Sequence, residues 1–401
     1  MPRRTRKEIF LSLIPLMILA LWGCAGRTAP KPAEAPMLKP ISSFSYPKFE
    51  DDMAMDGLSH AIEQSLCYYR KLDPEQRIAF GENTFPVGEV LNAMAEFSAF
   101  VAARPSPECL REFIHQRFRL YQIGGADGES VKFTGYYEPV IKGALASSDA
   151  YPHPIYGKPR DLVTVDLSGF SEEFQGKRIT GRWTGETFVP YHDRIAIETT
   201  GALEGYADIL AWTDDPVDLF FLQIQGSGKL ILEDGGILRL QYAASNGKPY
   251  RSIGKWLVEQ GRIEKERMSM QAIREYLAAH PQEREDILRV NPSYVFFEAG
   301  ENGPKGAIGV ALTPGRSIAT DSRLFPKGAL AFIMTRKPLI DAKGEICEWR
   351  DFSRFVVNQD TGGAIRGPSR ADIFWGSDDY AKIAAGHLQH MGALYFLAPV
   401  R

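Results

Sequence analysis

Apolar residues in the first part of the chain recur at steps of three and four, which is the spacing of one helix face. This spacing predicts helices over residues 51–72, 86–103 and 107–120, and Pro86 suits a first helical turn. From residue 131 to about 241 the pattern changes to short apolar runs between Gly and Pro clusters, which is typical of strands. Helices are predicted again over 253–260, 269–279 and 282–289, and strands follow from residue 294 to the end.

This order of elements predicts a mainly β protein with flanking helices, in which one domain is interrupted by another. A chain of 401 residues is long enough to form two cores. Apolar residues make up 44% of the chain and charged residues 24%, as in ordinary soluble globular proteins. The formal net charge of −3 provides no basic surface, so nucleic acid is excluded as a partner.

The N-terminus has the pattern of a targeting signal. Basic residues at positions 3, 4, 6 and 7 precede an apolar run over 9–22, which is too short to span a membrane. The run ends in Leu21-Trp22-Gly23-Cys24, which resembles a bacterial lipobox, so residues 1–24 are predicted to be a lipoprotein signal peptide with a lipid anchor at Cys24. In bacterial lipoproteins, a residue other than aspartate directly after the lipidated cysteine directs the protein to the outer membrane. Ala25 therefore predicts a location in the outer membrane, facing the periplasm. The alternative is an ordinary signal peptide in which Cys24 has no role.

Residues 25–47 contain several prolines and are predicted to form a flexible tether. Beyond it lie Cys67, Cys109 and Cys347. A Cys67–Cys109 disulfide is one reading and buried free thiols are the other. No cysteine spacing of the metal-binding kind is present. His387 and His390 are three positions apart, but no third ligand is evident, so surface or capping roles are favoured and no metal or cofactor is predicted.

The candidate chemistry is concentrated in residues 358–376, which contain Asp360 and Asp372. Each acid adjoins an apolar run, and Asp372 precedes Ile373-Phe374-Trp375. A carboxylic acid beside aromatic side chains is poorly solvated when charged, so it can keep a proton and donate it. Gly362 and Gly363 would let the backbone approach a ligand. In the alternative reading Asp360 caps a turn and Asp372 pairs with Arg366 or Arg370.

A second candidate region is the apolar run over residues 215–232, read as a strand that places Phe221, Gln223 and Gln225 on one face. The two glutamines would hydrogen-bond a polar polymer in a groove, or else be ordinary solvated strand residues. Residues 242–252 read as a loop with Asn246-Gly247 as its turn.

Several motifs occur in one order over residues 130–401: FTGYYEP, LQIQGSG, YAASNGKPYRSIG, SMQAIR, NPSYVFF, QDTGGAIRG and ADIFWG. In these motifs the chain resembles the membrane-bound lytic murein transglycosylase A family, and its last part resembles the "3D" domain, which is named for three aspartates. The resemblance implies a double-psi β-barrel catalytic domain formed by residues 48–132 and 303–401. A second β domain, residues 133–302, would be inserted into it and form the other wall of a glycan groove.

The resemblance also implies a peptidoglycan lytic exotransglycosylase, a glycan lyase that breaks the β-1,4 bond between N-acetylmuramic acid and N-acetylglucosamine without water and leaves 1,6-anhydro ends. The motif aspartate is Asp372, which would act as acid and then as base, with Asp360 close by. Asp379 is the first choice for the third aspartate and Asp378 the second. The residues themselves do not distinguish exo from endo cutting. The expected glycan-binding residues are Tyr136, Tyr137, Gln223, Gln225, Tyr242, Lys248, Ser252, Gly362, Gly363, Phe374 and Trp375.

Expected partners are peptidoglycan strands, the membrane through Cys24, and unidentified cell-wall synthesis or division proteins. Three other functions compete with this reading. One is a conventional peptidoglycan hydrolase that uses both aspartates and water. Another is a non-catalytic wall-binding lipoprotein. The third is an aspartic protease, because Asp360-Thr361-Gly362 reproduces its triplet, but such enzymes need two facing copies and this chain has one.

Overall fold

The computed structural model describes residues 38–400, apart from 124–129, 302 and 364. The predicted signal peptide, the lipidation residue Cys24 and the first part of the predicted tether lie outside this range. The tether prediction is wrong for its last residues. Leu38–Pro40 form strand β1, which pairs antiparallel with β4 (Phe118–Ile123), and the short helix η1 (Ser43–Ser45) follows.

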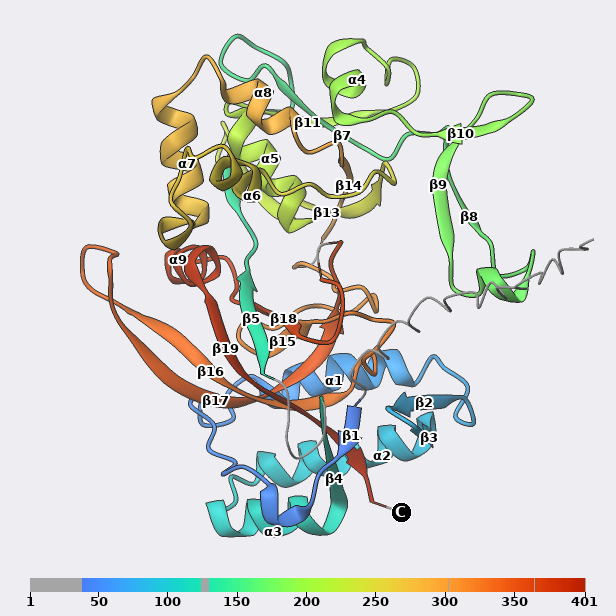
Figure 1. The fold of residues 1–401 in the computed structure, drawn as a ribbon, viewed down its shortest axis with the longest axis vertical. Coiled ribbons are helices and arrows are strands. Elements are labelled where there is room, and N and C mark those ends of the chain that lie inside the picture. The colour runs from blue at the N-terminus through green and yellow to red at the C-terminus, as the bar shows by residue number, and fades with distance from the viewer. Residues whose placement is uncertain (1–37, 124–129, 302, 364, 401) are drawn as a thin grey trace, which may run out of the picture. The chain divides into compact units, whose positions relative to one another are not determined.

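The main sheet closes on itself. Its strand order is β1-β4-β19-β16-β17-β15-β18-β5, and an additional pairing of β19 with β5 closes six of these strands into a barrel. The strands of the barrel are β5 (Val131–Tyr136), β15 (Ser317–Ala319), β16 (Leu330–Ile340), β17 (Ile346–Asp360), β18 (Arg370–Phe374) and β19 (Gln389–Pro399). The closed barrel confirms the predicted mainly β fold class (Figure 1).

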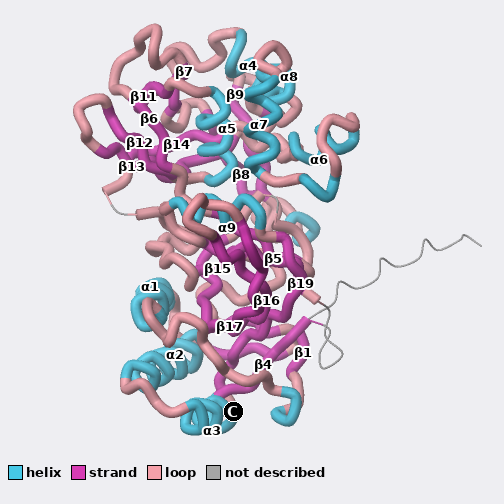
Figure 2. The backbone as a smooth tube through the Cα atoms, turned by 90° about the vertical axis from the view of Figure 1, so that its left-hand side faces the viewer, coloured by secondary structure: helices cyan, strands magenta, loops and turns pink. Residues whose placement is uncertain are grey.

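Helices cover one end of this barrel. Helices α1 (Leu58–Tyr69), α2 (Val87–Ala102) and α3 (Pro107–Arg117) pack near β17 and β4 and share their apolar core with the barrel strands (Figure 2). The hairpin of β2 (Arg77–Phe80) and β3 (Asn83–Pro86) lies between α1 and α2 in sequence, and α9 (Asp379–His387) packs against β5. Helices α1, α2 and α3 confirm the three-residue and four-residue periodicity read from the sequence, except that residues 118–120 belong to β4. Helix α9 interrupts a region that was predicted to contain only strands.

Helix α1 starts later than the predicted residue 51. The Asp51 carboxylate accepts hydrogen bonds from the Arg316 guanidinium at 2.6 and 2.9 Å and from the Met55 N–H at 3.2 Å. Ala54 and Met55 have positive φ angles of 48° and 66°, which a helix does not allow. Residues 51–57 therefore anchor the chain to the barrel instead of extending the helix.

The second β unit lies between β5 and β15 in the sequence. Its four-stranded sheet has the order β14-β13-β12-β6, formed by β6 (Val140–Gly143), β12 (Gly228–Leu232), β13 (Ile237–Ser245) and β14 (Val295–Ala299). Smaller sheets pair β7 (His153–Tyr156) with β11 (Ile209–Thr213), and β8 (Leu162–Asp166) with β9 (Arg178–Trp183) and β10 (Phe188–Pro190). The helices of this unit are η3 (Glu172–Phe174), α4 (Arg194–Thr199), α5 (Pro216–Gln225), α6 (Ile253–Glu259), η4 (Lys265–Arg267), α7 (Met270–Ala279) and α8 (Arg284–Arg289).

The predicted strand over residues 215–232 is wrong in its first half, which forms helix α5. Asp215 caps this helix by accepting a hydrogen bond from the Val217 N–H at 2.8 Å, and Pro216 occupies its first turn. Gly226 ends it in a left-handed conformation with φ 80°. A short apolar run fits a helix or a strand equally well, and here the capping residues decide. Gln223 and Gln225 therefore do not share a strand face.

Two smaller predictions also fail. Residues 307–315, read as part of a strand, form a loop before β15. Cys67, Cys109 and Cys347 are free, and Cys109 and Cys347 are exposed rather than buried.

Candidate active site

Asp360 and Asp372 lie on two strands that flank the short strand β15. Ala319 of β15 pairs with Asp360 on one side and with Asp372 on the other. Neighbouring strands are about 4.8 Å apart, so the two Cα atoms are separated by roughly 10 Å with only the Ala319 methyl group between them. Thr134 of β5 is the partner of Asp372 on its far side. The row Asp360, Ala319, Asp372 and Thr134 thus crosses four adjacent strands.

The apolar neighbours of Asp372 hold this row in place. Ala371 and Ile373 alternate with Asp372 along β18, are fully buried and belong to the main core. Asp372 therefore points to the opposite face of the sheet, where it keeps 8% of its surface exposed. The alternation of buried and functional positions comes directly from the period of a strand.

The Asp372 carboxylate has two protein partners. Arg370 donates from Nε to Oδ1 at 3.0 Å and from Nη2 to Oδ2 at 3.2 Å, and the Thr134 hydroxyl donates to Oδ1. Arg370 also reaches Thr134 Oγ1 at 3.2 Å. The predicted alternative, an ion pair of Asp372 with Arg370, is thus present in the structure. The Arg370 side chain is 35% exposed, so it has room to move.

Asp360 is held by a different set of donors. The Tyr136 hydroxyl donates to Oδ2 at 2.9 Å, and the backbone N–H groups of Ala307 and Thr361 donate to Oδ1 at 2.9 and 2.8 Å. Burial raises the pKa of Asp360 to about 6 against the lowering effect of these hydrogen bonds, and the nearby charge of Asp372 adds to the rise. Asp360 therefore changes charge close to neutral pH.

The loop before β15 explains how Ala307 reaches Asp360. A Cβ atom on Gly306 would lie 2.3 Å from the Gln359 carbonyl oxygen, so only glycine allows the loop to come this close to β17. This contact places the Ala307 N–H against the carboxylate of the next residue in β17, Asp360.

The burial of Asp360 leads to a pH-dependent stability prediction. The folded protein keeps a proton on Asp360 up to about pH 6, whereas the unfolded chain releases it near the ordinary value of 3.8. The folded state binds more protons in this window, so the free energy of unfolding should fall as pH rises from about 4 to 6, by about 2–3 kcal/mol at most. Asp360→Asn should lack this component. Urea unfolding of both proteins at pH 4 and pH 7 measures it, and a constant difference between the two proteins would contradict it.

Aromatic side chains line the same face. The rings of Tyr136 and Phe374 are 5.3 Å apart, and burial with the nearby charges of Asp360 and Asp372 raises the pKa of Tyr136. Tyr137 points away, is buried, and its N–H donates to Gln225 Oε1 at 3.1 Å. Trp375 also leaves this face, since it packs against Phe352 and Tyr380. Of the two tyrosines, only Tyr136 thus faces the acids.

The expected binding residues of the second β unit separate into two groups. Gln225 contacts the end of β5 through Tyr137, and Tyr242 is 54% exposed on β13. Lys248 lies in the 246–252 loop, and Ser252 caps helix α6 by accepting from the Lys255 N–H at 3.1 Å. Gln223, in contrast, is buried, and its Oε1 accepts from Arg194 Nη2 at 2.6 Å. The structure does not bring Gln223 to the acids.

The glycine loop has structural contacts. Arg366 donates to the carbonyl oxygens of Gly362 and Ile365 at 3.3 and 3.2 Å, which holds the loop after Asp360. A side chain at Gly363 would meet nothing within 4 Å.

The two histidines near the C-terminus have structural contacts. His387 bonds the Ile383 carbonyl at 3.0 Å, and the His390 ring contacts Trp349. Within the described residues no cluster of three or more His, Cys, Asp or Glu side chains is placed to hold a metal.

Sequence reasoning missed two residues near this site. Burial raises the pKa of Tyr250, while its hydrogen bond to Ser252 and the charge of Arg370 lower it, so this tyrosine brings the 246–252 loop near Arg370. Asp321, just after β15, is buried and accepts from the Gly367 N–H at 2.9 Å, and its bond to Arg323 holds its pKa well below the usual range. The signal for Asp321 was an acid directly after a buried strand.

Asp321 is the aspartate that contacts the loop between Asp360 and Asp372. Asp378 instead caps helix α9 by accepting from the Ala381 N–H at 2.7 Å, and Asp379 lies exposed in the first turn of that helix. The geometry favours Asp321 over Asp378 and Asp379 as the third acid of this region.

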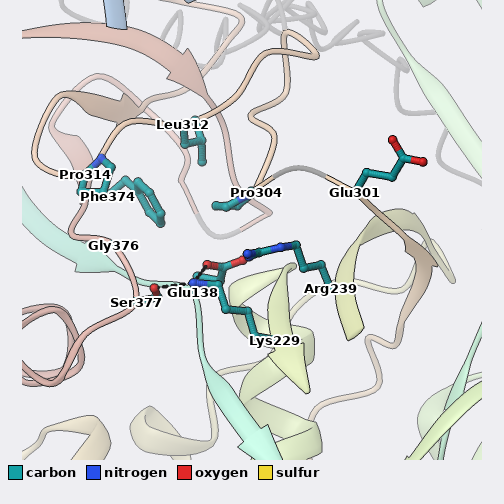
Figure 3. Close-up of a pocket in the computed structure, with 11 residues that line it drawn as sticks. Glu138, Lys229, Arg239, Glu301, Pro304, Leu312, Pro314, Phe374, Gly376 and Ser377 are labelled. Carbon is teal, nitrogen blue, oxygen red and sulfur yellow. Dashed lines mark hydrogen bonds and ion pairs between the residues drawn. The ribbon is translucent and has the colours of Figure 1, made fainter. Parts of the chain in front are cut away.

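A pocket of about 370 Å³ is lined by Phe374, two residues beyond Asp372 on β18, but by neither acid. Figure 3 shows its lining residues. At its base Lys229 Nζ lies 2.9 Å from Glu138 Oε2 and donates to Ser377 Oγ at 2.7 Å. Glu138 is thus already paired with a lysine.

The chain is similar in sequence to known proteins. The family model "MltA specific insert domain" matches residues 132–298, and the "3D domain" model matches residues 316–398. The chain is 36% identical over 281 residues to the membrane-bound lytic murein transglycosylase A of Escherichia coli, covering 69% of this chain and 68% of that protein. It is 31% identical to the protein of that name from Vibrio cholerae, with 73% of this chain and 75% of the relative covered.

Solved structures give the same picture. A membrane-bound lytic murein transglycosylase from Agrobacterium tumefaciens matches with a TM-score of 0.73 and 31% identity, over 90% of this chain and 98% of that one. Escherichia coli MltA with bound chitohexaose matches with a TM-score of 0.66 and 28% identity, over 92% of this chain and 97% of that one.

Proposed function

Since the chain belongs to the family of membrane-bound lytic murein transglycosylase A, whose members cleave peptidoglycan, we propose that it breaks the β-1,4 bond between N-acetylmuramic acid and N-acetylglucosamine without water. The product would carry a 1,6-anhydro ring. The observation that carries this proposal is the row of Asp360, Ala319 and Asp372 on one face of the barrel, with Tyr136 and Phe374 beside it.

Asp372 is the proposed catalytic residue. Its carboxyl proton passes to the glycosidic oxygen as the bond to C1 breaks. The carboxylate then removes the proton of the C6 hydroxyl as that oxygen bonds to C1, which returns the acid to its starting state. One carboxyl group can thus perform both steps, and the bound chitohexaose of the Escherichia coli relative is a β-1,4 glycan of the kind that such a site would hold.

The ion pair with Arg370 has to open before this reaction. A carboxylate that accepts two guanidinium hydrogen bonds is in its base form, whereas the first step needs the acid form. We therefore expect the arriving glycan to displace Arg370, which is 35% exposed and already within 3.2 Å of Thr134 Oγ1. Without its guanidinium partner, and shielded from water by the glycan, the carboxylate takes up from solvent the proton that it then donates.

Asp360 is assigned a positioning role. It fixes the Tyr136 hydroxyl and the loop at Ala307, and its own charge near Asp372 opposes a second negative charge at the site. Tyr136 and Phe374 offer apolar faces for a pyranose ring. Tyr242, Lys248, Ser252 and Gln225 are proposed to contact the glycan from the second β unit, which we assign to residues 133–302.

A conventional hydrolase is the second candidate, because two carboxyls on one face, separated by one strand, resemble the acid and base of an inverting enzyme. The products distinguish the two reactions. Purified murein should be digested with a soluble form that lacks residues 1–24, and the fragments should be weighed. Products with non-reducing 1,6-anhydro ends, lighter by one water, support the transglycosylase. Reducing ends identify the hydrolase.

We also propose that the protein is an outer-membrane lipoprotein facing the periplasm. None of the helices in the described part of the chain is long and apolar enough to cross a membrane. The proposed anchor is the lipobox-like sequence Leu21-Trp22-Gly23-Cys24. The expected result is that the full chain incorporates labelled palmitate and fractionates with the outer membrane, whereas Cys24→Ala does neither. Membrane retention of the unlabelled Cys24→Ala protein would contradict this proposal.

A further inference from the structure

The pocket lined by Phe374 begins close to the proposed catalytic acid along strand β18. Phe374 lines the pocket and is two residues beyond Asp372 on β18, so both side chains share one face. A strand rises about 3.3 Å per residue, so the pocket begins roughly 7 Å from the catalytic carboxyl. Gly376 and Ser377, directly after β18, continue its wall.

Two acidic and two basic side chains line this pocket, and one acid forms an ion pair with one base. Glu138 and Lys229 neutralise each other through their 2.9 Å ion pair. For Arg239 and Glu301, the described part of the chain provides no ion-pair partner within the pocket or elsewhere. Figure 3 shows Arg239 extending toward the Glu138–Lys229 pair, while Glu301 lies at the rim with its carboxylate turned outward. The pocket therefore presents one available cation inside and one available anion at its rim.

The remaining wall is apolar. Pro304, Leu312, Pro314 and Phe374 lie together across from the charged residues (Figure 3). A neutral sugar would leave Arg239 and Glu301 without charged partners. A ligand with a carboxylate, an ammonium group and small apolar side chains would satisfy all three parts of the pocket.

We propose that this pocket binds the stem peptide attached to the muramic acid at the cleaved bond. This inference rests on the proposed function. Stem peptides combine alanine methyl groups with carboxylates and, at the diamino acid, an ammonium group. A peptide carboxylate pairs with Arg239, the ammonium group pairs with Glu301, and the alanine methyl groups contact Leu312 and Phe374. The pocket thereby makes the enzyme prefer peptide-bearing glycan strands.

The test compares kcat/KM on peptide-bearing strands with kcat/KM on the same strands after an amidase has removed the peptides. For the unmodified protein we expect a ratio of about tenfold or more, the effect of one charge-assisted contact. Arg239→Met should bring the ratio close to one, and Arg239→Lys should retain most of it. Arg119→Met is the matched control, because Arg119 is an exposed arginine of β4 outside the pocket, and it should keep the ratio.

Glu301→Gln is a second test of the pocket. Because Glu301 is exposed, this test does not depend on whether the Arg239 variants fold. Acetylation of the peptide ammonium should lower the ratio in the unmodified protein and leave it unchanged in Glu301→Gln. Equal rates on both substrates in the unmodified protein, or an Arg239→Met ratio equal to that of the control, would overturn the pocket assignment alone. Absence of turnover on both substrates would instead refute the proposed function.

Discussion

Asp372→Asn is expected to lose turnover while it still binds glycan. The amide cannot give a proton to the leaving oxygen or take one from the C6 hydroxyl, so kcat should fall by about 10²- to 10⁴-fold. The change keeps the size of the side chain, which has only 8% of its surface exposed. The measurement is release of anhydro-ended fragments from purified murein, together with sedimentation of the protein with insoluble murein.

Asp379→Asn is the matched control for this substitution. It makes the same chemical change seven positions along the chain, at an exposed residue in the first turn of α9. It should retain turnover. If Asp372→Asn were as active as this control, the site would have to be assigned to another acid, and Asp360 would be the first to test.

Arg316→Met is expected to produce the largest loss of stability. The Arg316 and Asp51 side chains are 0% and 2% exposed and form a 2.6 Å ion pair, and Arg316 also donates to the Asp56 and Phe355 carbonyl oxygens. Arg316 lowers the pKa of Asp51 against the effect of burial. Removing the guanidinium leaves an unpaired buried carboxylate, which costs about 3–5 kcal/mol. The free energy of unfolding in urea measures the effect.

Arg336→Met is the comparison for the stability experiment. Arg336 also pairs with an aspartate on a barrel strand, but the side chains of Arg336 and Asp351 are 47% and 91% exposed. Such exposed pairs contribute less than about 1 kcal/mol. If the two variants lowered the free energy of unfolding equally, the burial of the Arg316–Asp51 pair would not add to its contribution to stability. Turnover should also fall in Arg316→Met. Arg316 directly precedes β15, whose last residue, Ala319, lies between the two acids.

The sequence was sufficient to predict the elements in which one pattern dominates. The strand β18 was predictable because Ala371 and Ile373 alternate with Asp372, and the helix predicted over residues 269–279 agrees with α7, which Ser269 caps. The motif resemblance indicated the barrel, which local patterns alone do not determine, because its closure depends on the pairing of β5 with β19 across more than two hundred positions.

The errors have identifiable physical causes. Helix α5 was mistaken for a strand because its apolar run is short, and the capping roles of Asp215 and Gly226 were not used. The position of Gln223 could not be predicted, because its partner Arg194 is distant in sequence and buried. The role of Asp321 depends on a loop that returns to it at Gly367, which no local pattern reveals.

Strand β5 contacts both acids and also leads directly into the second β unit. Thr134 and Tyr136 hold the two acids, and the chain runs from Tyr136 directly through Tyr137 and Glu138 into the second β unit. Gly135 between them has no room for a methyl group, since a Cβ there would lie 2.7 Å from the Ala385 backbone. The residues that hold the two acids therefore lie on the segment that leads into the second β unit. Ala307, on the segment that returns from that unit, also holds Asp360.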